Sequence, residues 1–168
     1  MQLADLHLEQ QDVNPKFDVE TDILMLLYTR NNPSAGQRLF NNADSVRNSN
    51  FNPNWPVRIL VHGWTGSQTS PSIVGPKDAY MQHGDFNVIG VDWAEGAQTI
   101  NYITARNRVS DVGAFVARFI DFLHAEGFTQ FHQVQVMGHS LGAHVAGICG
   151  KKVTRGRVQT VCFKNYKK

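Results

Sequence analysis

The sequence predicts an α/β fold built on a mainly parallel sheet, and two patterns carry this prediction. Short apolar runs of strand length alternate with longer segments of helical periodicity. Strands that alternate with helices pair in parallel through right-handed crossovers. The chain has 168 residues, 42% hydrophobic and 18% charged, which suffices for one folded core. We therefore expect a leader outside the core at 1–17 and one domain over 18–168.

Turn residues and hydrophobic periodicity divide the domain into strands and helices. Ser110 is the expected N-cap of an amphipathic helix that Gly127 ends. In chain order, we expect strands over 18–29, 37–40, 57–61 and 86–93, an Asn-rich loop through 54, helices over 70–84 and from 110, and a last strand within 158–163.

Residues 132–147 are the stretch on which the rest of the fold is organised. They read HQVQVMGHSLGAHVAG, a β-branched strand, a G-x-S-x-G motif and a helix of small residues. This is the sequence form of a nucleophile elbow, a sharp strand-to-helix turn that presents a serine hydroxyl at the edge of a sheet. A Cβ at Gly138 or Gly142 would collide with the neighbouring strand or helix. The free N–H groups of the following helix would face developing negative charge at Ser140.

Composition and charge exclude several classes of function. No apolar run approaches the ~18 residues of a membrane span, and the N-terminus lacks the pattern of a signal peptide. The first 140 residues carry 9 basic and 14 acidic side chains, whereas the last 28 carry 7 basic and none acidic. The basic residues form no helical stripe and alternate with no aromatics, so we expect a solvated terminus and no nucleic-acid partner. The two cysteines, Cys149 and Cys162, are expected as buried thiols.

Three blocks of sequence together resemble one family. They are Val61-His62-Gly63-Trp64, Val91-Asp92-Trp93 and residues 138–147, and the intervals between them also fit. In this combination the chain is similar to the pancreatic-lipase-like family of α/β-hydrolases over roughly residues 18–160. The family consists of secreted esterases that act on triacylglycerols or on the sn-1 ester of phospholipids, and of some relatives that bind without catalysis.

The resemblance implies roles for three residues. Ser140 matches the nucleophile, and the backbone N–H groups of Trp64 and Leu141 match the two donors of an oxyanion hole. The implied substrate is a lipid ester or a lipid interface, without a cofactor or a metal ion. The implied location is extracellular, although the chain carries no signal peptide.

The catalytic acid and base have no match in the sequence. In this fold they follow the nucleophile, yet no Asp or Glu follows Ser140 and the one later histidine is His144. The sequence departs from the family pattern at Val161 or Cys162, and Asn165 stands where the acid is expected. We therefore expect an α/β-hydrolase portion that ends just after the elbow helix, an inactive chain, and a truncated isoform or an exon read-through as the origin.

Other polar residues have structural as well as catalytic interpretations. We expect His62 to be a buried, hydrogen-bonded turn residue rather than a base. We expect Asp92, at the end of a strand, to have a structural capping role rather than to serve as the acid. His139 is expected to pack against neighbouring strands. Trp64 could face lipid or simply pack. The spacing of the remaining histidines predicts no zinc site; they are His83, His124 and His132.

Two further hypotheses compete with that of an esterase. The chain could be a non-catalytic lipid-binding protein or a relative similar to the yolk proteins, because the first half of the family pattern is present and the catalytic second half is not. It could also be unstable, because only residues 158–163 remain to cover the apolar edge of the elbow strand.

Overall fold

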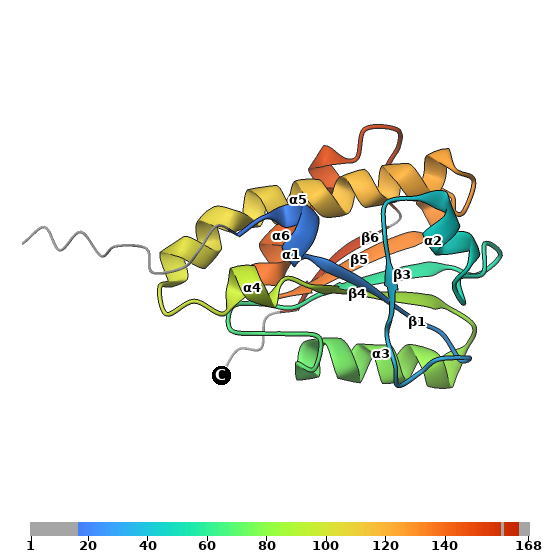
Figure 1. Cartoon of the computed structure of the whole chain (residues 1–168), viewed down its shortest axis with the longest axis horizontal. Helices are drawn as coiled ribbons and strands as arrows, with labels where there is room; N and C mark the ends of the chain where they lie inside the picture. The colour runs from blue at the N-terminus through green and yellow to red at the C-terminus, as the bar shows by residue number, and fades with distance from the viewer. Residues whose placement is uncertain (1–16, 159, 165–168) are drawn as a thin grey trace, which may run out of the picture.

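The computed structural model describes residues 17–158 and 160–164, the latter segment by its backbone. A six-stranded sheet in the order β2-β1-β4-β3-β5-β6 runs through its centre (Figure 1). The strands are β1 (Leu24–Tyr28), β2 (Gln37–Leu39), β3 (Val57–Val61), β4 (Asn87–Asp92), β5 (Val134–His139) and β6 (Thr160–Lys164).

The sheet is parallel where it carries the site and antiparallel at the opposite edge. β3 pairs in parallel with both β4 and β5, and β5 pairs in parallel with β6. β1 pairs antiparallel with β2 and with β4. The registers Val61↔Val91 and Val61↔Gly138 bring the carboxyl ends of the three central strands level with one another. Loops that follow these ends therefore meet at one edge of the sheet, where ligands of open α/β sheets bind.

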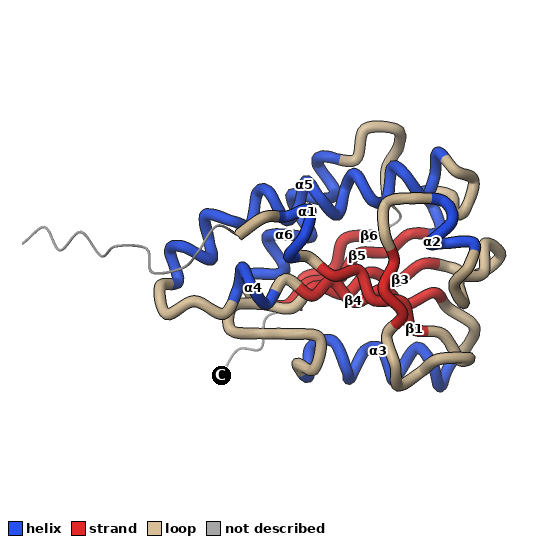
Figure 2. Tube along the Cα trace, viewed as in Figure 1, coloured by secondary structure: helices blue, strands red, loops and turns tan. Residues whose placement is uncertain are grey.

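Helices cover both faces of the sheet, but unequally. In Figures 1 and 2, α3 lies alone on one face, and α5 and α6 cover the other face together with α1 and α2. The bounds are α1 (Val19–Asp22), α2 (Ala43–Arg47), α3 (Pro71–His83), α4 (Ala94–Ala97), α5 (Tyr102–Ala125), the 3₁₀ turn η1 (Phe131–Gln133) and α6 (Leu141–Lys152).

The larger core lies between the sheet and the pair α5 and α6. It includes Ile59 and Val136 from the central strands and Val116 and Ile120 from α5, all fully buried. The smaller core lies under α3 and combines Ile73 with Leu60, Val88, Leu26 and Tyr28 of the sheet. Both faces of the central strands are thus buried, which explains their nearly continuous apolar sequences.

The expected start of the longest helix was wrong. α5 begins at Tyr102, and the side chain of Asn101 accepts a hydrogen bond from the N–H of Ile103 at 2.9 Å. Ser110 lies inside this helix and is exposed. Both residues have cap chemistry, and the extra turns pack Ala105 and Val109 into the core. The end was close to expectation, because α5 ends at Ala125 and Gly127, two residues further on, has φ 77°.

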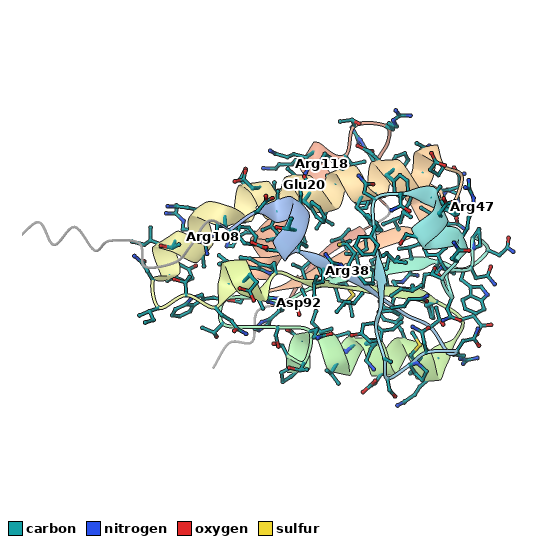
Figure 3. All side chains as sticks on the ribbon, in the orientation of Figure 1. Glu20, Arg38, Arg47, Asp92, Arg108 and Arg118 are labelled. Carbon is teal, nitrogen blue, oxygen red and sulfur yellow. The ribbon has the colours of Figure 1, made fainter. Side chains whose placement is uncertain are left out.

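Two short helices replace expected extended or irregular segments. Residues 19–22 form α1 rather than the beginning of a strand, and the carboxylate of Asp18 caps it by accepting from the N–H of Glu20. α2 interrupts the Asn-rich loop, where the side chain of Asn42 accepts from the N–H of Ser45. The salt bridge between Glu20 and Arg118 ties α1 to α5; both residues are labelled in Figure 3. Contacts to other elements select these helices, since each is only about one turn long.

The remaining strand predictions agree with the structure within one or two residues at most ends. The last expected strand forms as β6, which covers the edge of β5. Among the residues that the structure describes, no helix has both the length and the apolar character needed to cross a bilayer. Residues 1–16 of the predicted leader and Asn165 lie outside the described residues.

Candidate active site

Ser140 occupies a sharp turn between β5 and α6. Its backbone has φ 53° and ψ −120°, a conformation that costs a non-glycine residue about 1–3 kcal/mol. Across the described residues, the other non-glycine residue at positive φ is Thr65, with φ 58°. Both strained residues lie at the carboxyl edge of the sheet, one in the elbow and one in the loop after β3. Ser140 itself is exposed to solvent.

Two glycines make the elbow turn possible. A Cβ on Gly138 would lie 2.1 Å from the carbonyl oxygen of Gly142, and a Cβ on Gly142 would lie 2.4 Å from that of His62. The obstructing atoms are backbone, so neither contact could relax by a change of rotamer. The N–H of Ala143 donates to the carbonyl of Ser140 at 3.0 Å, which closes the first turn of α6. The strand–turn–helix expected from the sequence is confirmed, with α6 pressed against the end of β3.

Gly63 joins the loop after β3 to this elbow. A Cβ built there would lie 2.9 Å from the carbonyl oxygen of His139, 3.0 Å from Cβ of Ser140 and 3.4 Å from the backbone nitrogen of Leu141. The structure therefore brings together the backbone around all three residues singled out in the sequence, because Trp64 directly follows Gly63. Close backbone approach explains why this position requires a glycine.

Behind this loop lies a buried network centred on His62. The imidazole is fully buried, and its Nδ1 lies 2.9 Å from the carbonyl oxygen of Gly63. Its Nε2 lies 3.2 Å from Oδ1 of Asp92 and 3.0 Å from the backbone nitrogen of Trp93. The indole of Trp93 stacks on the imidazole with ring centroids 5.6 Å apart and donates from Nε1 to the carbonyl of His62 at 2.9 Å. The expectation of a buried, hydrogen-bonded turn histidine is confirmed.

Asp92 anchors the same network from the end of β4. Figure 3 labels it near α4, where its Oδ1 accepts the N–H of Ala94 at 3.1 Å. Burial opposes ionisation of this carboxyl, but the adjacent His62 ring and hydrogen bonds from the backbone N–H groups of Ala94 and Gln68 outweigh it. The pKa of Asp92 is consequently lowered below its ordinary value. The expected capping role is confirmed.

Two further histidines flank Ser140 in the chain. His144 lies exposed on α6, about one turn beyond Ser140, and His139 is half-buried at the end of β5. Across residues 17–158, no group of three His, Cys, Asp or Glu side chains could hold a metal ion. Burial raises the pKa of the Cys149 thiol to about 12, in agreement with a buried, unreactive cysteine; the side chain of Cys162 lies outside the description.

A group of exposed hydrophobic side chains borders the loop after β3. We call Trp64, Ile100, Tyr102 and Ile103 the exposed apolar patch; their exposed fractions are 38%, 103%, 44% and 60%. Trp64 and Tyr102 contact edge to face with centroids 5.4 Å apart, and Nε1 of Trp64 donates to the carbonyl of Thr99 at 2.9 Å. Sequence reasoning singled out Trp64 alone. The signal for the other members was that Ile100 and Ile103 are apolar residues between the strand predicted over 86–93 and the helix predicted from 110.

Ser140 lies at a strained turn between a parallel strand and a helix, with Gly138 and Gly142 on either side of it. This arrangement is typical of the α/β-hydrolases. The family model described as Lipase matches residues 4–162. The chain belongs to the lipase family, of the pancreatic lipase type.

Individual relatives extend this comparison. Human pancreatic triacylglycerol lipase (Homo sapiens) is 34% identical over 150 residues, 88% of this chain and 30% of the relative. Phospholipase A1 member A of Bos taurus is 34% identical over 141 residues, 83% of this chain and 30% of the relative. Inactive pancreatic lipase-related protein 1 of Mus musculus is 38% identical over 128 residues, 76% of this chain and 27% of the relative. The chain thus spans under a third of the length of these relatives.

Proposed function

We propose that Ser140 is the nucleophile of a carboxylic ester hydrolase of the lipase type, with an acyl-serine intermediate. The observation that carries this proposal is the strained backbone of Ser140 at the start of α6, with Gly63 so close that a Cβ built on it would lie 3.0 Å from Cβ of Ser140. Strain at an exposed serine is characteristic of sites where a side chain must be presented to a substrate. The relatives support a lipid ester as substrate, either a triacylglycerol or a phospholipid. Family membership also supports an extracellular location.

The proposed chemistry assigns one task to each group. Oγ of Ser140 bonds to the ester carbonyl carbon and its proton passes to a base, while the carbonyl oxygen becomes an oxyanion. The N–H groups of Trp64 and Leu141 would donate to that oxyanion, each contributing about 3 kcal/mol to transition-state stabilisation. The bond from the carbonyl carbon to the ester oxygen then breaks, the alcohol leaves with a proton, and water releases the acid from the serine.

After Ser140 the 168 residues contain no Asp or Glu, and the one later histidine, His144, lies on α6 about one turn beyond the serine. A serine without its base loses several orders of magnitude in rate. We therefore expect the chain to hydrolyse a nitrophenyl butyrate no faster than its Ser140→Ala variant. Turnover clearly above that control would contradict an inactive chain.

The nucleophile can be tested by supplying the missing base from solution. In excess imidazole, a fluorophosphonate should modify Ser140 as Oγ bonds to phosphorus, fluoride leaves and imidazole takes the proton. Peptide mass spectrometry should find the adduct on Ser140 and not on Ser110, an exposed serine inside α5 that serves as an internal control. Equal modification of both serines would contradict the proposed nucleophile.

A non-catalytic lipid-binding role is the second candidate, and the exposed apolar patch favours it. Large exposed apolar groups that lie together mark binding surfaces more often than scattered ones do. Saturable binding of a fluorescent fatty acid by the chain, weakened in a variant combining Ile100→Ser with Ile103→Ser, would support this role. Absence of saturable binding would reject it.

A further inference from the structure

We propose that His62 is a positioning residue for the oxyanion hole, because its Nδ1–H holds the Gly63 carbonyl and thereby aims the N–H of Trp64. This inference rests on the proposed function of Ser140. It concerns the peptide between Gly63 and Trp64, whose two ends have different neighbours. The carbonyl of Gly63 faces inward, where Nδ1 of His62 lies 2.9 Å away and the N–H of Gly66 donates at 3.1 Å.

The planarity of the peptide bond transmits this constraint. In a trans peptide the C=O and the N–H lie in one plane and point in opposite directions. The described residues contain no cis peptide bond. Two donors on the Gly63 oxygen therefore fix the direction of the Trp64 N–H, away from His62. Hydrogen bonds to a carbonyl also polarise the N–H of the same peptide and strengthen it as a donor.

The imidazole has little freedom to turn away. It is fully buried, it stacks on Trp93 with an interplanar angle of 10°, and the Trp93 indole is itself bonded to the His62 carbonyl. Gly66 closes the other side, since a Cβ there would lie 2.8 Å from Nδ1 of His62. The ring is thus clamped between the end of β4 and the loop 63–66.

The neighbours of the ring select its protonated nitrogen. Gly63 offers only an acceptor to Nδ1, so that nitrogen must carry a hydrogen. At Nε2, the ring faces both the acceptor Asp92 and the donor Trp93. The neutral ring with its hydrogen on Nδ1 donates to the Gly63 carbonyl and accepts the N–H of Trp93 at Nε2. The imidazolium donates to Gly63 from Nδ1 and to Asp92 from Nε2. Both forms keep the bond to Gly63, and the tautomer with its hydrogen on Nε2 alone is excluded.

The first test reads the tautomer in the unmodified chain. Long-range ¹H–¹⁵N spectra of the His62 ring should show a protonated Nδ1. An unprotonated Nδ1 would overturn the proposal, and this measurement needs no variant to fold.

The second test separates the two sides of the ring. The amide of an asparagine side chain occupies the place of Nδ1, and that of a glutamine side chain the place of Nε2. His62→Asn should therefore keep the donor to Gly63, whereas His62→Gln should lose it. The ¹⁵N resonance of the Trp64 amide responds to hydrogen bonding at the preceding carbonyl. It should stay near its parent position in the first variant and shift in the second.

The functional readout uses the fluorophosphonate reaction in excess imidazole. Loss of one oxyanion donor costs about 10²–10³ in rate, so misaiming it in His62→Gln should slow modification of Ser140 roughly tenfold or more. His62→Asn should remain within about threefold of the parent, as should His83→Gln, a control at an exposed histidine of α3. Thermal melting checks that each variant is folded.

The two proposals fail in different ways. Modification of Ser140 at equal rates in folded His62→Asn and His62→Gln would overturn the positioning role and leave the nucleophile standing. A correct Nδ1 tautomer and Trp64 shift without selective modification of Ser140 would overturn the nucleophile, and the positioning role with it.

Discussion

A single hydrogen atom in place of a methyl group decides whether the elbow can form at Gly142. A Cβ there would lie 2.4 Å and 2.5 Å from the carbonyl oxygens of His62 and Val61. We predict that Gly142→Ala lowers the free energy of unfolding by about 1–3 kcal/mol or more, because backbone atoms must move to relieve the contact. Urea denaturation followed by circular dichroism measures the change.

Gly75 on α3 is the matched control. Apart from its chain neighbours and the backbone of its own helix, nothing lies within 4 Å of a Cβ at this position. The free energy of unfolding of Gly75→Ala should therefore lie within about 1 kcal/mol of that of the parent. Similar losses in both variants would show that the elbow packs less tightly than these distances indicate.

At the same scale, Asp92 links stability to pH. Its pKa is lowered in the fold, so its ionised form stabilises the native state above the ordinary pKa of 3.8, and this contribution is lost as the pH falls through the lower, folded pKa. Asp92→Asn should be less stable than the parent by roughly 1–3 kcal/mol at neutral pH, and the difference should shrink below about pH 4. Melting temperatures across this range measure it.

The exposed Asp85 provides the comparison, since its ion pair with Arg30 lies in solvent at 3.2 Å. Such pairs contribute about 0–1 kcal/mol. Asp85→Asn should follow the stability profile of the parent. A difference for Asp92→Asn that persists unchanged into acid would contradict a role for the ionised carboxylate.

At the scale of an element, α5 shows how a helix chooses between two possible starts. Asn101 and Ser110 both have side chains that can cap, but only Asn101 has an extended backbone and accepts a hydrogen bond from the helix. Asn101→Ala should lower the free energy of unfolding by about 1 kcal/mol. Ser110→Ala should leave it unchanged or raise it slightly, because alanine is the better interior helix residue. If chemical denaturation showed a larger loss of stability for Ser110→Ala than for Asn101→Ala, that result would favour a helix that begins at Ser110.

At the scale of the whole molecule, the two faces of the sheet differ in how much they bury. α3 buries Ile73 and Lys77, and it contains Pro76, which has no N–H to donate. α5 buries nine residues and packs against α6 and the larger core. Local opening should therefore expose α3 before α5.

Hydrogen exchange followed by mass spectrometry tests this order. Peptides from α3 should exchange faster than those from α5, while the whole chain should still melt in one cooperative transition, because both cores share the strands of one sheet. Equal protection of the two helices would contradict an unequal division of stability. Absence of a cooperative transition would favour the hypothesis of an unstable chain.

Local chemistry was sufficient to predict the central strands and the elbow. Strand 57–61 is a short apolar run, and the strand before Ser140 alternates inward and outward residues, so period and length identify both without any tertiary contact. The glycines at 138 and 142 could likewise be interpreted from the motif alone, because a turn this sharp excludes Cβ atoms on steric grounds.

Contacts between distant segments decided the rest. The start of α5 and the formation of α1 depend on packing against other elements, which cap chemistry alone does not report. The pairing of His62 with Asp92, 30 residues apart, exists only because β3 and β4 end side by side. The amino-acid pattern thus specified where the chain turns and which serine is presented. Only the folded sheet decided which buried side chains hold the loop beside that serine, since hydrogen bonds between separate strands depend on their register in space.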